Sequence, residues 1–218
     1  VHRFTGNFED GDDLTLCCLE MMDEAGLATL PDRAAPSALA GPAEWRCSYE
    51  IRERTLGEFS PLPLLLHICM EVPGLRRKSG EIYTLLAELY NNALEHGVLE
   101  LPSEWKHSPE GFGRYYAERN RRLANVEGHY IRFTLHHSLK PDGGRLRVIC
   151  EDSGQGFDFH NHPSVAPGNS PTMSGRYAWR GLLLLKRLAE TIRFHEQGNH
   201  VEIVYDWQFA RTAENRDD

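Results

Sequence analysis

The sequence predicts an α+β fold in which a mixed β-sheet is covered by helices on one face. Short segments that alternate apolar and polar side chains are typical of half-buried strands. Longer amphipathic segments with capping residues are typical of helices. Along the chain the order is one strand, three helices, two strands, a long polar segment, one helix and two strands. This order favours a sheet with helices packed on one side.

Composition and charge are those of a globular chain. Of the 218 residues, 40% are hydrophobic and 26% are charged. The sequence has 24 Lys and Arg and 32 Asp and Glu, so its formal charge is −8. We therefore expect neither nucleic acid nor an acidic membrane as a partner. The apolar runs at 62–70 and 182–185 are shorter than the roughly 20 residues of a membrane span.

Cysteine usage and the start of the sequence suggest a compartment. The five cysteines show no CxxC pair and no spacing of a disulfide framework, so we expect reduced thiols. The first residues, "VHRFTGNFEDGDDL", lack the basic and apolar order of a signal peptide. We therefore expect a fragment of a longer cytoplasmic protein.

Residues 1–46 are expected to precede the main domain. "LTLCCL" at 14–19 follows an Asp-rich turn and is apolar throughout, as a strand buried on both faces is. The next stretch is rich in Ala, Pro and Gly and lacks periodicity, which is typical of a linker. We expect four parts: the end of one domain at 1–22, a linker at 23–46, a second domain at 47–209 and a frayed tail at 210–218.

The first half of the second domain predicts one strand and three helices. "CSYEIRERT" from residue 47 alternates as a half-buried strand does. Ser60 and Pro61 begin a helix that runs to about Val72 and either covers the core or forms a dimer face. A second helix spans 80–97 and ends at Gly97. A third, amphipathic helix lies within 108–128, and its arginines are expected to face solvent, with an acidic partner as the alternative.

The second half predicts a hairpin, a lid, a helix and two final strands. Residues 129–139 and 145–152 are strands joined by "KPDGG", a hairpin turn signal. Residues 158–179 are polar without a clear period, as functional lids or disordered loops are. The helix runs from about Gly181 to Thr191. The last two strands are expected near 192–195 and 200–209, with a turn at "EQGN".

The second helix carries a polar edge that is either a solvated stripe or a site. In "LAELYNNALEHGVL", residues 86–99, Glu88, Asn92 and His96 follow one another at four-residue steps beside an apolar face. Two later features favour a site. An Asp-x-Gly-x-Gly, "DSGQG", comes directly after an apolar strand, and "RGLLLLKRL" opens a helix after the polar segment.

These three segments resemble the GHKL ATPase/kinase superfamily. "ELYNNALEHG" is similar to its asparagine box, and "DSGQGF" and "RGLLLLKRL" to its two glycine boxes. The resemblance is strongest to serine protein kinases of the anti-sigma-factor type, which carry Glu-x-x-x-Asn-Ala-x-x-His-Gly. It covers roughly residues 47–209. It implies the Bergerat fold, a two-layer sandwich with an ATP lid at 157–180, and the cofactors ATP and Mg²⁺.

The resemblance implies a role for each matching residue, and the residue types suit those roles. Glu88 would be the general base that orients the attacking hydroxyl. Asn92 would give Mg²⁺ one amide oxygen, beside phosphate oxygens. Asp152 would accept a hydrogen bond from the adenine amino group. The remaining nucleotide-binding candidates are His96, Gly97, Gly154, Gly156, Arg180, Gly181 and Leu182.

Some of these candidates have structural alternatives. His96 is equally well explained as a capping or core histidine. The helix start at Arg180 is equally a plain helix N-terminus. Two departures from the family pattern also stand out: Trp179 takes the place of the first Gly of the last box, and Asn199 stands where a Thr often follows Gly198.

Two further clusters were weighed. "GDDLTLCCLEM" resembles the closing strand of sporulation-type, metal-dependent phosphatases, with Asp12 at a metal-ligand position. Such a phosphatase precedes an anti-sigma-type kinase in fused bacterial response regulators. His160 and His162 near Asp158 lie in a polar loop without a matching Cys pair, so we do not expect a zinc site there.

We therefore expect an ATP- and Mg²⁺-dependent serine kinase domain that phosphorylates a small anti-sigma antagonist protein and so controls a sigma factor. The resemblance also favours a homodimer. Trp179 motivates the alternative, a nucleotide-impaired module that sequesters an anti-sigma factor or its antagonist without phosphotransfer. A histidine-kinase catalytic domain fits less well, because such domains usually lack a carboxylate at the position of Glu88.

Overall fold

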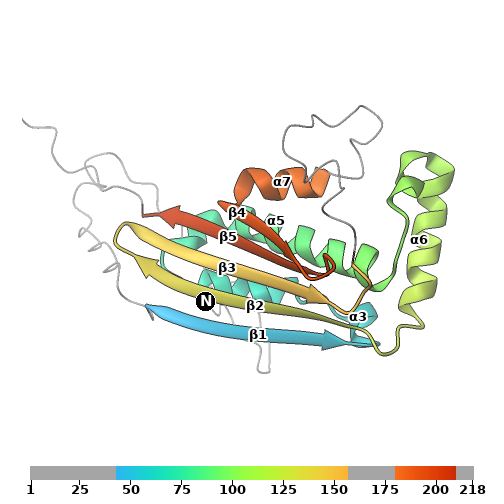
Figure 1. Cartoon of the computed structure of the whole chain (residues 1–218), viewed down its shortest axis with the longest axis horizontal. Helices are drawn as coiled ribbons and strands as arrows, with labels where there is room; N and C mark the ends of the chain where they lie inside the picture. Colours follow the sequence, from blue (N-terminus) through green and yellow to red (C-terminus); the bar gives the residue numbers. More distant parts are fainter. Residues whose placement is uncertain (1–42, 157–179, 210–218) are drawn as a thin grey trace, which may run out of the picture. The chain divides into compact units, whose positions relative to one another are not determined.

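The structure is a computed structural model that describes residues 43–156 and 180–209. These residues form an α+β arrangement of one sheet with helices against it (Figure 1). Several expectations lie outside the described residues: the strand at 14–19, most of the linker, the lid and the tail. The phosphatase-like Asp12 and the pair His160 and His162 lie outside them as well.

The sheet has five strands in the order β1-β2-β3-β5-β4. Every neighbouring pair is antiparallel, so the expectation of a mixed sheet is wrong for the described part of the chain. Short turns between β2 and β3 and between β4 and β5 favour antiparallel pairing. The strands are β1 Glu44–Arg52, β2 Tyr130–Lys140, β3 Gly143–Asp152, β4 Thr191–His195 and β5 His200–Gln208. β1 begins within the expected linker.

The four predicted helices are present in the described residues. Their bounds are α4 Leu62–Met70, α5 Ser79–Asn91, α6 Pro109–Leu123 and α7 Arg180–Leu188. Ser108 caps α6, since its Oγ accepts a hydrogen bond from Gly111 N at 3.0 Å. Three short helical segments were not predicted, because each is five residues or fewer and too brief for periodicity to reveal: α3 Thr55–Glu58, η1 Leu75–Lys78 and η3 Ser103–His107. A fourth, η2 Asn92–Val98, continues α5 and falls almost wholly within the helix predicted over 80–97.

The core lies between the sheet and α5, which runs behind the sheet in Figure 1. Alternate residues of β2 and β3 point to this side, and the 3.6-residue period of α5 brings its apolar stripe to the same layer. The fully buried side chains of these elements include Ile82, Leu85, Leu86, Ile131, Phe133, Leu135 and Leu146. α4 contributes Leu65 and Cys69 to the same core and so covers it.

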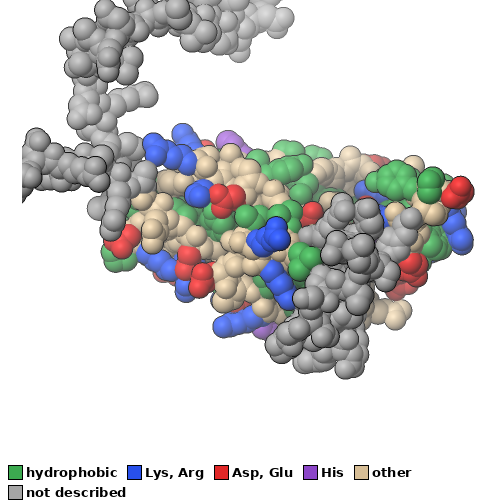
Figure 2. Space-filling model, turned by 90° about the horizontal axis from the view of Figure 1, so that it is seen from above, with side chains coloured by type: hydrophobic (Ala, Val, Ile, Leu, Met, Phe, Trp, Pro, Cys, Tyr) green, Lys and Arg blue, Asp and Glu red, His purple; other side chains and the backbone are tan. Residues whose placement is uncertain are grey.

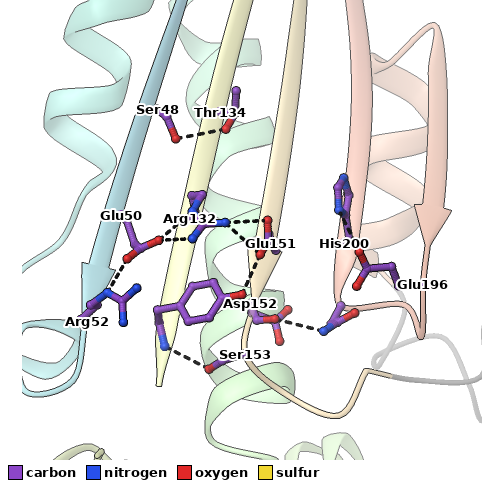
Figure 3. A network of polar contacts seen from close by, with 12 residues as sticks. Ser48, Glu50, Arg52, Arg132, Thr134, Glu151, Asp152, Ser153, Glu196 and His200 are labelled. Carbon is purple, nitrogen blue, oxygen red and sulfur yellow. Dashed lines mark hydrogen bonds and ion pairs between the residues drawn. The ribbon is translucent and has the colours of Figure 1, made fainter. Parts of the chain in front are cut away.

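The opposite face of the sheet is held by cross-strand ion pairs (Figure 3). Arg132 on β2 pairs with Glu50 on β1 and donates to Glu151 on β3 at 3.1 Å. Tyr130 OH donates to Glu151 Oε1 at 2.6 Å. These contacts join β2 to its two neighbours, β1, which is distant in sequence, and β3, the other strand of its hairpin; opposite charges on adjacent strands stabilise such pairing.

The second predicted helix ends differently from expectation. α5 passes at Asn92 into η2, a π-helical segment that continues to Val98. Within it Leu99 N donates to Leu94 O at 2.8 Å, the five-residue spacing of a π-turn. Gly97 therefore lies inside the helical segment, and its φ is not positive. The prediction that Gly97 is a helix C-cap is wrong. Gly97 instead packs closely against the Asp152 carboxylate.

One surface of the molecule is drawn in Figure 2. Over the face seen there, basic and acidic side chains are interspersed among polar and apolar ones. Apolar side chains also gather on α6, where Phe112 and Tyr116 are 50% and 44% exposed with ring centroids 4.8 Å apart. Among the described residues, no helix is long and apolar enough to cross a membrane.

Candidate functional site

The α5–η2 helix holds Glu88 and Asn92 one turn apart. The amide of Asn92 donates to the carbonyl of Glu88, so the predicted four-residue step is kept. Asn92 is exposed, and Glu88 is partly buried. The π-segment begins at Asn92, and π-turns inserted in α-helices are frequent at functional sites. The two side chains that the sequence singled out thus occupy the point where the helix changes its winding.

Glu88 lies against the start of α7. A Cβ built on Gly181 would lie 2.1 Å from Glu88 Oε2, so a side chain at this position would require the Glu88 carboxylate to shift. Burial raises the pKa of Glu88, and Glu95 adds to this, while the charge of Lys106 opposes it. Among the described residues, no side chain donates a hydrogen bond to the Glu88 carboxylate. A carboxylate with a raised pKa and an unused acceptor is suited to take a proton.

Asp152 ends β3 on the covered side of the sheet and is 7% exposed. Its Oδ1 accepts a hydrogen bond from Gly154 N at 2.9 Å. Burial raises the pKa of Asp152 to about 6, and the charge of Glu151 adds to this shift. The hydrogen bond from Gly154 acts in the opposite direction and lowers the pKa. In the folded protein this carboxyl is therefore ionised at neutral pH and becomes protonated near pH 6.

Gly97 and Gly154 are packed around Asp152. A Cβ on Gly97 would lie 2.3 Å from Asp152 Oδ1, and a Cβ on Gly154 would lie 2.3 Å from Gly97 O. At distances below 3.0 Å an atom has to shift, and neither the backbone carbonyl of Gly97 nor the buried, hydrogen-bonded Asp152 carboxylate shifts easily, so glycine is favoured at both positions. The end of the α5–η2 helix and the "DSGQG" segment, which were noted separately in the sequence, therefore meet at Asp152.

The turn between β4 and β5 packs against the "DSGQG" segment that contains Asp152. Gly156 has φ +77°, and a Cβ there would lie 2.0 Å from Gln197 O. Asn199 Nδ2 donates to the carbonyls of Asp152 and Gly154, each at 3.2 Å. Asn199 Oδ1 is buried and has no partner among the described residues. Asn199, noted in the sequence as a departure, thus braces the glycine box and leaves one acceptor free.

His96 has a structural role. Its Nδ1 lies 2.9 Å from Leu101 O, and its Nε2 lies 3.4 Å from Ser103 Oγ. Both ring nitrogens are therefore engaged with the chain that follows η2. Of the two alternatives left open by the sequence, the capping one agrees with these contacts.

Glu95 was missed by the sequence reasoning. It is 9% exposed and accepts hydrogen bonds from Lys106 Nζ at 2.8 Å, Tyr115 OH at 2.7 Å and Arg119 Nε at 3.2 Å. Burial alone would raise its pKa, but these hydrogen bonds and the two positive charges hold it below the ordinary value. Arg119 had been expected to face solvent. Glu95 lies within the π-helical segment η2, where the regular α-helical period used for the prediction does not hold.

The other members of the last box contribute through the backbone and the core. Arg180 and Gly181 begin α7, and Leu182 is 8% exposed and belongs to the core. The first amides of a helix have no partner within it and favour anions. The structure thus brings Gly181 to Glu88. Trp179 lies outside the described residues.

The candidate site is the polar edge of the α5–η2 helix. The start of α7 lies against this edge at Glu88, and the end of β3 lies against it at Gly97. Along it lie a carboxylate that can accept a proton, an exposed amide and a buried carboxylate. Among the described residues no cluster of three or more His, Cys, Asp or Glu could hold a metal ion. Mg²⁺ bound here would therefore take one amide oxygen from Asn92 and its other ligands from phosphate and water, which is the coordination it favours.

No family model matches this sequence, and no curated protein matches it.

Proposed function

We propose that residues 47–209 form a Bergerat-type ATP-binding domain that acts as a Mg²⁺-dependent serine protein kinase. The observation that carries the proposal is the convergence at one helix edge. A Cβ on Gly97 would meet the buried Asp152 carboxylate, a Cβ on Gly154 would meet the Gly97 carbonyl, and a Cβ on Gly181 would meet the Glu88 carboxylate. Segments that are far apart in sequence therefore meet along one helix edge, which supports a nucleotide site there.

Asp152 would hold the base of the nucleotide. An ionised carboxylate accepts hydrogen bonds only, and the exocyclic amine of adenine donates. The glycines at 97, 154 and 156 allow the end of η2, the end of β3 and the β4–β5 turn to pack closely around Asp152. The unpartnered Oδ1 of Asn199 is a second acceptor beside Asp152, so the two acceptors agree in favouring a ligand that donates.

Asn92, Glu88 and the start of α7 would hold the reacting end. Asn92 offers its amide oxygen to Mg²⁺, and the first amides of α7 offer hydrogen bonds to phosphate oxygens. ATP, when bound, would supply the γ-phosphoryl group: the serine oxygen would form a bond to the γ-phosphorus as the bond to the β–γ bridging oxygen breaks and ADP leaves. Glu88 would accept the proton of the serine hydroxyl in this step, and its raised pKa suits this task.

The substrate proposed is a small anti-sigma antagonist protein, in a cytoplasmic partner-switching circuit. This part of the proposal comes from the resemblance of the three boxes to anti-sigma-type kinases. The sequence "GDDLTLCCLEM", which resembles the closing strand of a phosphatase, agrees with it, because opposed phosphatase and kinase domains on one polypeptide would set the phosphorylation of one substrate.

One observation favours the alternative function, a binding module without phosphotransfer. The Glu88 carboxylate lies against the start of α7, where phosphates would otherwise bind. If Glu88 holds this place permanently, ATP is excluded, and the chain would bind an anti-sigma factor or its antagonist without chemistry. The two functions differ in nucleotide binding, which is measurable directly.

The test is calorimetric titration of the full chain with ATP and Mg²⁺. We expect binding by the wild type, a loss of roughly tenfold or more in affinity for Asp152→Asn and Asn92→Ala, and near wild-type affinity for Glu118→Gln on α6. Glu88→Gln should bind ATP and fail to transfer phosphate from labelled ATP to serine. Absence of binding by the wild type would reject the kinase and favour the binding module.

The pH dependence of this binding follows from Asp152. Its pKa of about 6 lies above the ordinary 3.8, so the carboxylate that accepts the amine hydrogen bond is lost as the pH falls through 6. We expect ATP affinity to decrease from pH 7 to pH 5 in the wild type. Asp152→Asn should remove this dependence, and an affinity that is equally pH-dependent in the variant would contradict the role of Asp152.

A further inference from the structure

A cavity of about 220 Å³ adjoins the start of β1 and the end of α4. Its apolar walls are Trp45, Ile68, Val72 and Pro73. An apolar cavity of about 150 Å³ is large enough to bind benzene, so this one has room for one aromatic ring with a short substituent. Its volume and walls therefore favour a small ligand with a ring-sized apolar body.

The polar residues that line this cavity differ in exposure. His67 and Glu71 are exposed and lie one helical turn apart at the end of α4, so they form the mouth of the cavity. His137 of β2 is 0% exposed and forms the floor. A ligand that fills the cavity would therefore meet a polar mouth, apolar walls and a polar floor.

His137 has a polar edge that the fold leaves unused. Neither ring nitrogen has a hydrogen-bond partner among the described residues. The rings of Trp45 and Trp207 stack on the two faces of the imidazole, so a polar group can reach it only at its edge. A buried polar group without a partner destabilises a fold, and phenylalanine would fill the same stack without this cost. A ligand in the cavity accounts for a histidine here, whereas packing does not.

The mouth of the cavity favours a positive charge. The Glu71 carboxylate accepts hydrogen bonds and donates none. It is exposed, and its ion pair with Arg76 is exposed and 3.8 Å long, which makes that pair weak. The ring face of Trp45 also attracts cations. An ammonium group on the ligand suits both residues, and a carboxylate would be repelled by Glu71.

The floor of the cavity favours a neutral hydroxyl group. Burial lowers the pKa of His137, so its ring is neutral and has one donor and one acceptor nitrogen. A hydroxyl group can likewise donate and accept. A charged group at this depth would be buried without an opposite charge, which is costly. The ligand would therefore place its charge at the mouth and its hydroxyl group at the floor.

This cavity is separate from the candidate nucleotide site. On β2, His137 lies opposite Leu146. Asp152 lies opposite Ile131, six residues earlier on the same strand. At about 3.4 Å per residue, the two positions are about 20 Å apart. A ligand in the cavity would not overlap a nucleotide at Asp152, and its binding does not rest on kinase activity.

We propose that this cavity binds a small phenolic amine, that is, an aromatic ring with an ammonium group at one end and a hydroxyl group at the other. The ammonium group pairs with Glu71 at the mouth. The ring packs against Trp45 and the aliphatic walls. The hydroxyl group makes its hydrogen bond to the edge of His137, which supplies the partner that the fold itself does not.

The first test is calorimetric titration of the full chain with three probes of similar size: tyramine, 2-phenylethylamine and 3-(4-hydroxyphenyl)propionate. We expect tyramine to bind. Loss of the hydroxyl group should weaken binding about fivefold, as loss of one hydrogen bond does. A carboxylate in place of the ammonium group should weaken it at least tenfold, because like charges repel. No saturable binding of tyramine at millimolar concentrations, or equal affinity for all three probes, would overturn the proposal.

The second test assigns each end of the ligand to a residue. His137→Phe should stay folded, since it removes buried polar atoms, and should bind tyramine and 2-phenylethylamine equally. Glu71→Gln should bind tyramine at least fivefold more weakly and discriminate less against the carboxylate. Glu58→Gln, an exposed carboxylate on α3, is the control and should leave all three affinities unchanged. A His137→Phe variant that still prefers tyramine, or a Glu71→Gln variant that behaves as the wild type, would contradict the site.

Discussion

At the scale of single residues, the candidate site depends on glycines that allow close contact rather than on glycines that allow unusual φ. Gly97 and Gly181 are helical and would be replaceable by alanine on conformational grounds. A Cβ at either position would meet a carboxylate, Asp152 for Gly97 and Glu88 for Gly181. Asp152 is short, buried and hydrogen-bonded, so it yields less easily than the longer, partly buried Glu88.

Gly97→Ala should destabilise the fold, because its Cβ would lie 2.3 Å from Asp152 Oδ1 and the buried carboxylate would have to move. We expect a loss of about 1–3 kcal/mol in the free energy of unfolding, together with weaker ATP binding. The matched control is Gly80→Ala on the same helix, where a Cβ meets nothing within 4 Å and should add about 0.4–1 kcal/mol. Urea unfolding of both variants checks this, and equal effects would contradict the close contact.

His137 is a residue whose burial has no polar compensation among the described residues. Its side chain is 0% exposed, and neither ring nitrogen has a hydrogen-bond partner there. It lies between the rings of Trp45 and Trp207, with centroids 5.7 Å and 5.5 Å away. Burial lowers its pKa, and the charge of His136 adds to this. The ring is therefore neutral in the folded protein.

His137→Phe should stabilise the protein by about 1–2 kcal/mol, because it keeps the ring stack and removes buried polar atoms without partners. The pKa of His137 is lower folded than unfolded, so the unfolded chain takes up a proton first as the pH falls below about 6.5. Wild-type stability therefore decreases on that side, and the variant should lose less. Urea unfolding at pH 7 and pH 5 tests this, with His136→Phe as the control; a steeper loss in His137→Phe would contradict it.

At the scale of elements, the π-segment η2 connects the site to the rest of the domain. Within it Glu95 is buried while Asn92 is exposed. Glu95 then fixes η3 through Lys106 and α6 through Tyr115 and Arg119. One carboxylate thus holds two later elements against the helix that carries the candidate site.

Glu95→Gln should weaken this junction, because it removes the charge that Lys106 and Arg119 pair with and cannot accept all three hydrogen bonds. We expect a loss of about 2–4 kcal/mol and faster hydrogen exchange in α6. Since the pKa of Glu95 is lowered in the folded state, its contribution is lost as the pH falls through that value. Glu118→Gln, on the exposed side of α6, is the control. Equal stability and exchange in the two variants would contradict the role of Glu95.

At the scale of the whole molecule, the described residues differ in how firmly they are packed. β2 and β3 pair on both sides and bury most of their inward side chains. α6 has one buried side chain, Tyr115, and exposes Phe112 and Tyr116. Local stability follows buried apolar contacts, so the sheet centre and α6 should open independently.

Hydrogen exchange of the wild type should show this difference. Amides of β2 and β3 should exchange only through global unfolding, and amides of α6 through local opening at lower free energy. Mass spectrometry of peptides covering 109–123 and 130–152 measures both. Exchange of α6 as slow as that of β2, across increasing denaturant, would show that α6 is part of the same cooperative unit.

Most elements of the described fold could be predicted from sequence, because they depend on local periodicity and caps. The alternation at 129–139 and the Ser-Pro start of α6 each have a local physical cause. The antiparallel pairing of all strands was missed, since partner choice depends on contacts across the sheet. The short helices and the π-turn were missed too, because one inserted residue leaves no periodic signal.

The candidate site divides in the same way. The sequence by itself determined the residue types and the helical spacing of Glu88, Asn92 and His96, since both are local. Only the tertiary structure decided that Gly97 faces Asp152, that Gly181 faces Glu88 and that Asn199 braces the glycine box. These contacts join segments distant along the chain, and packing in three dimensions, rather than any local preference, determines which of them meet.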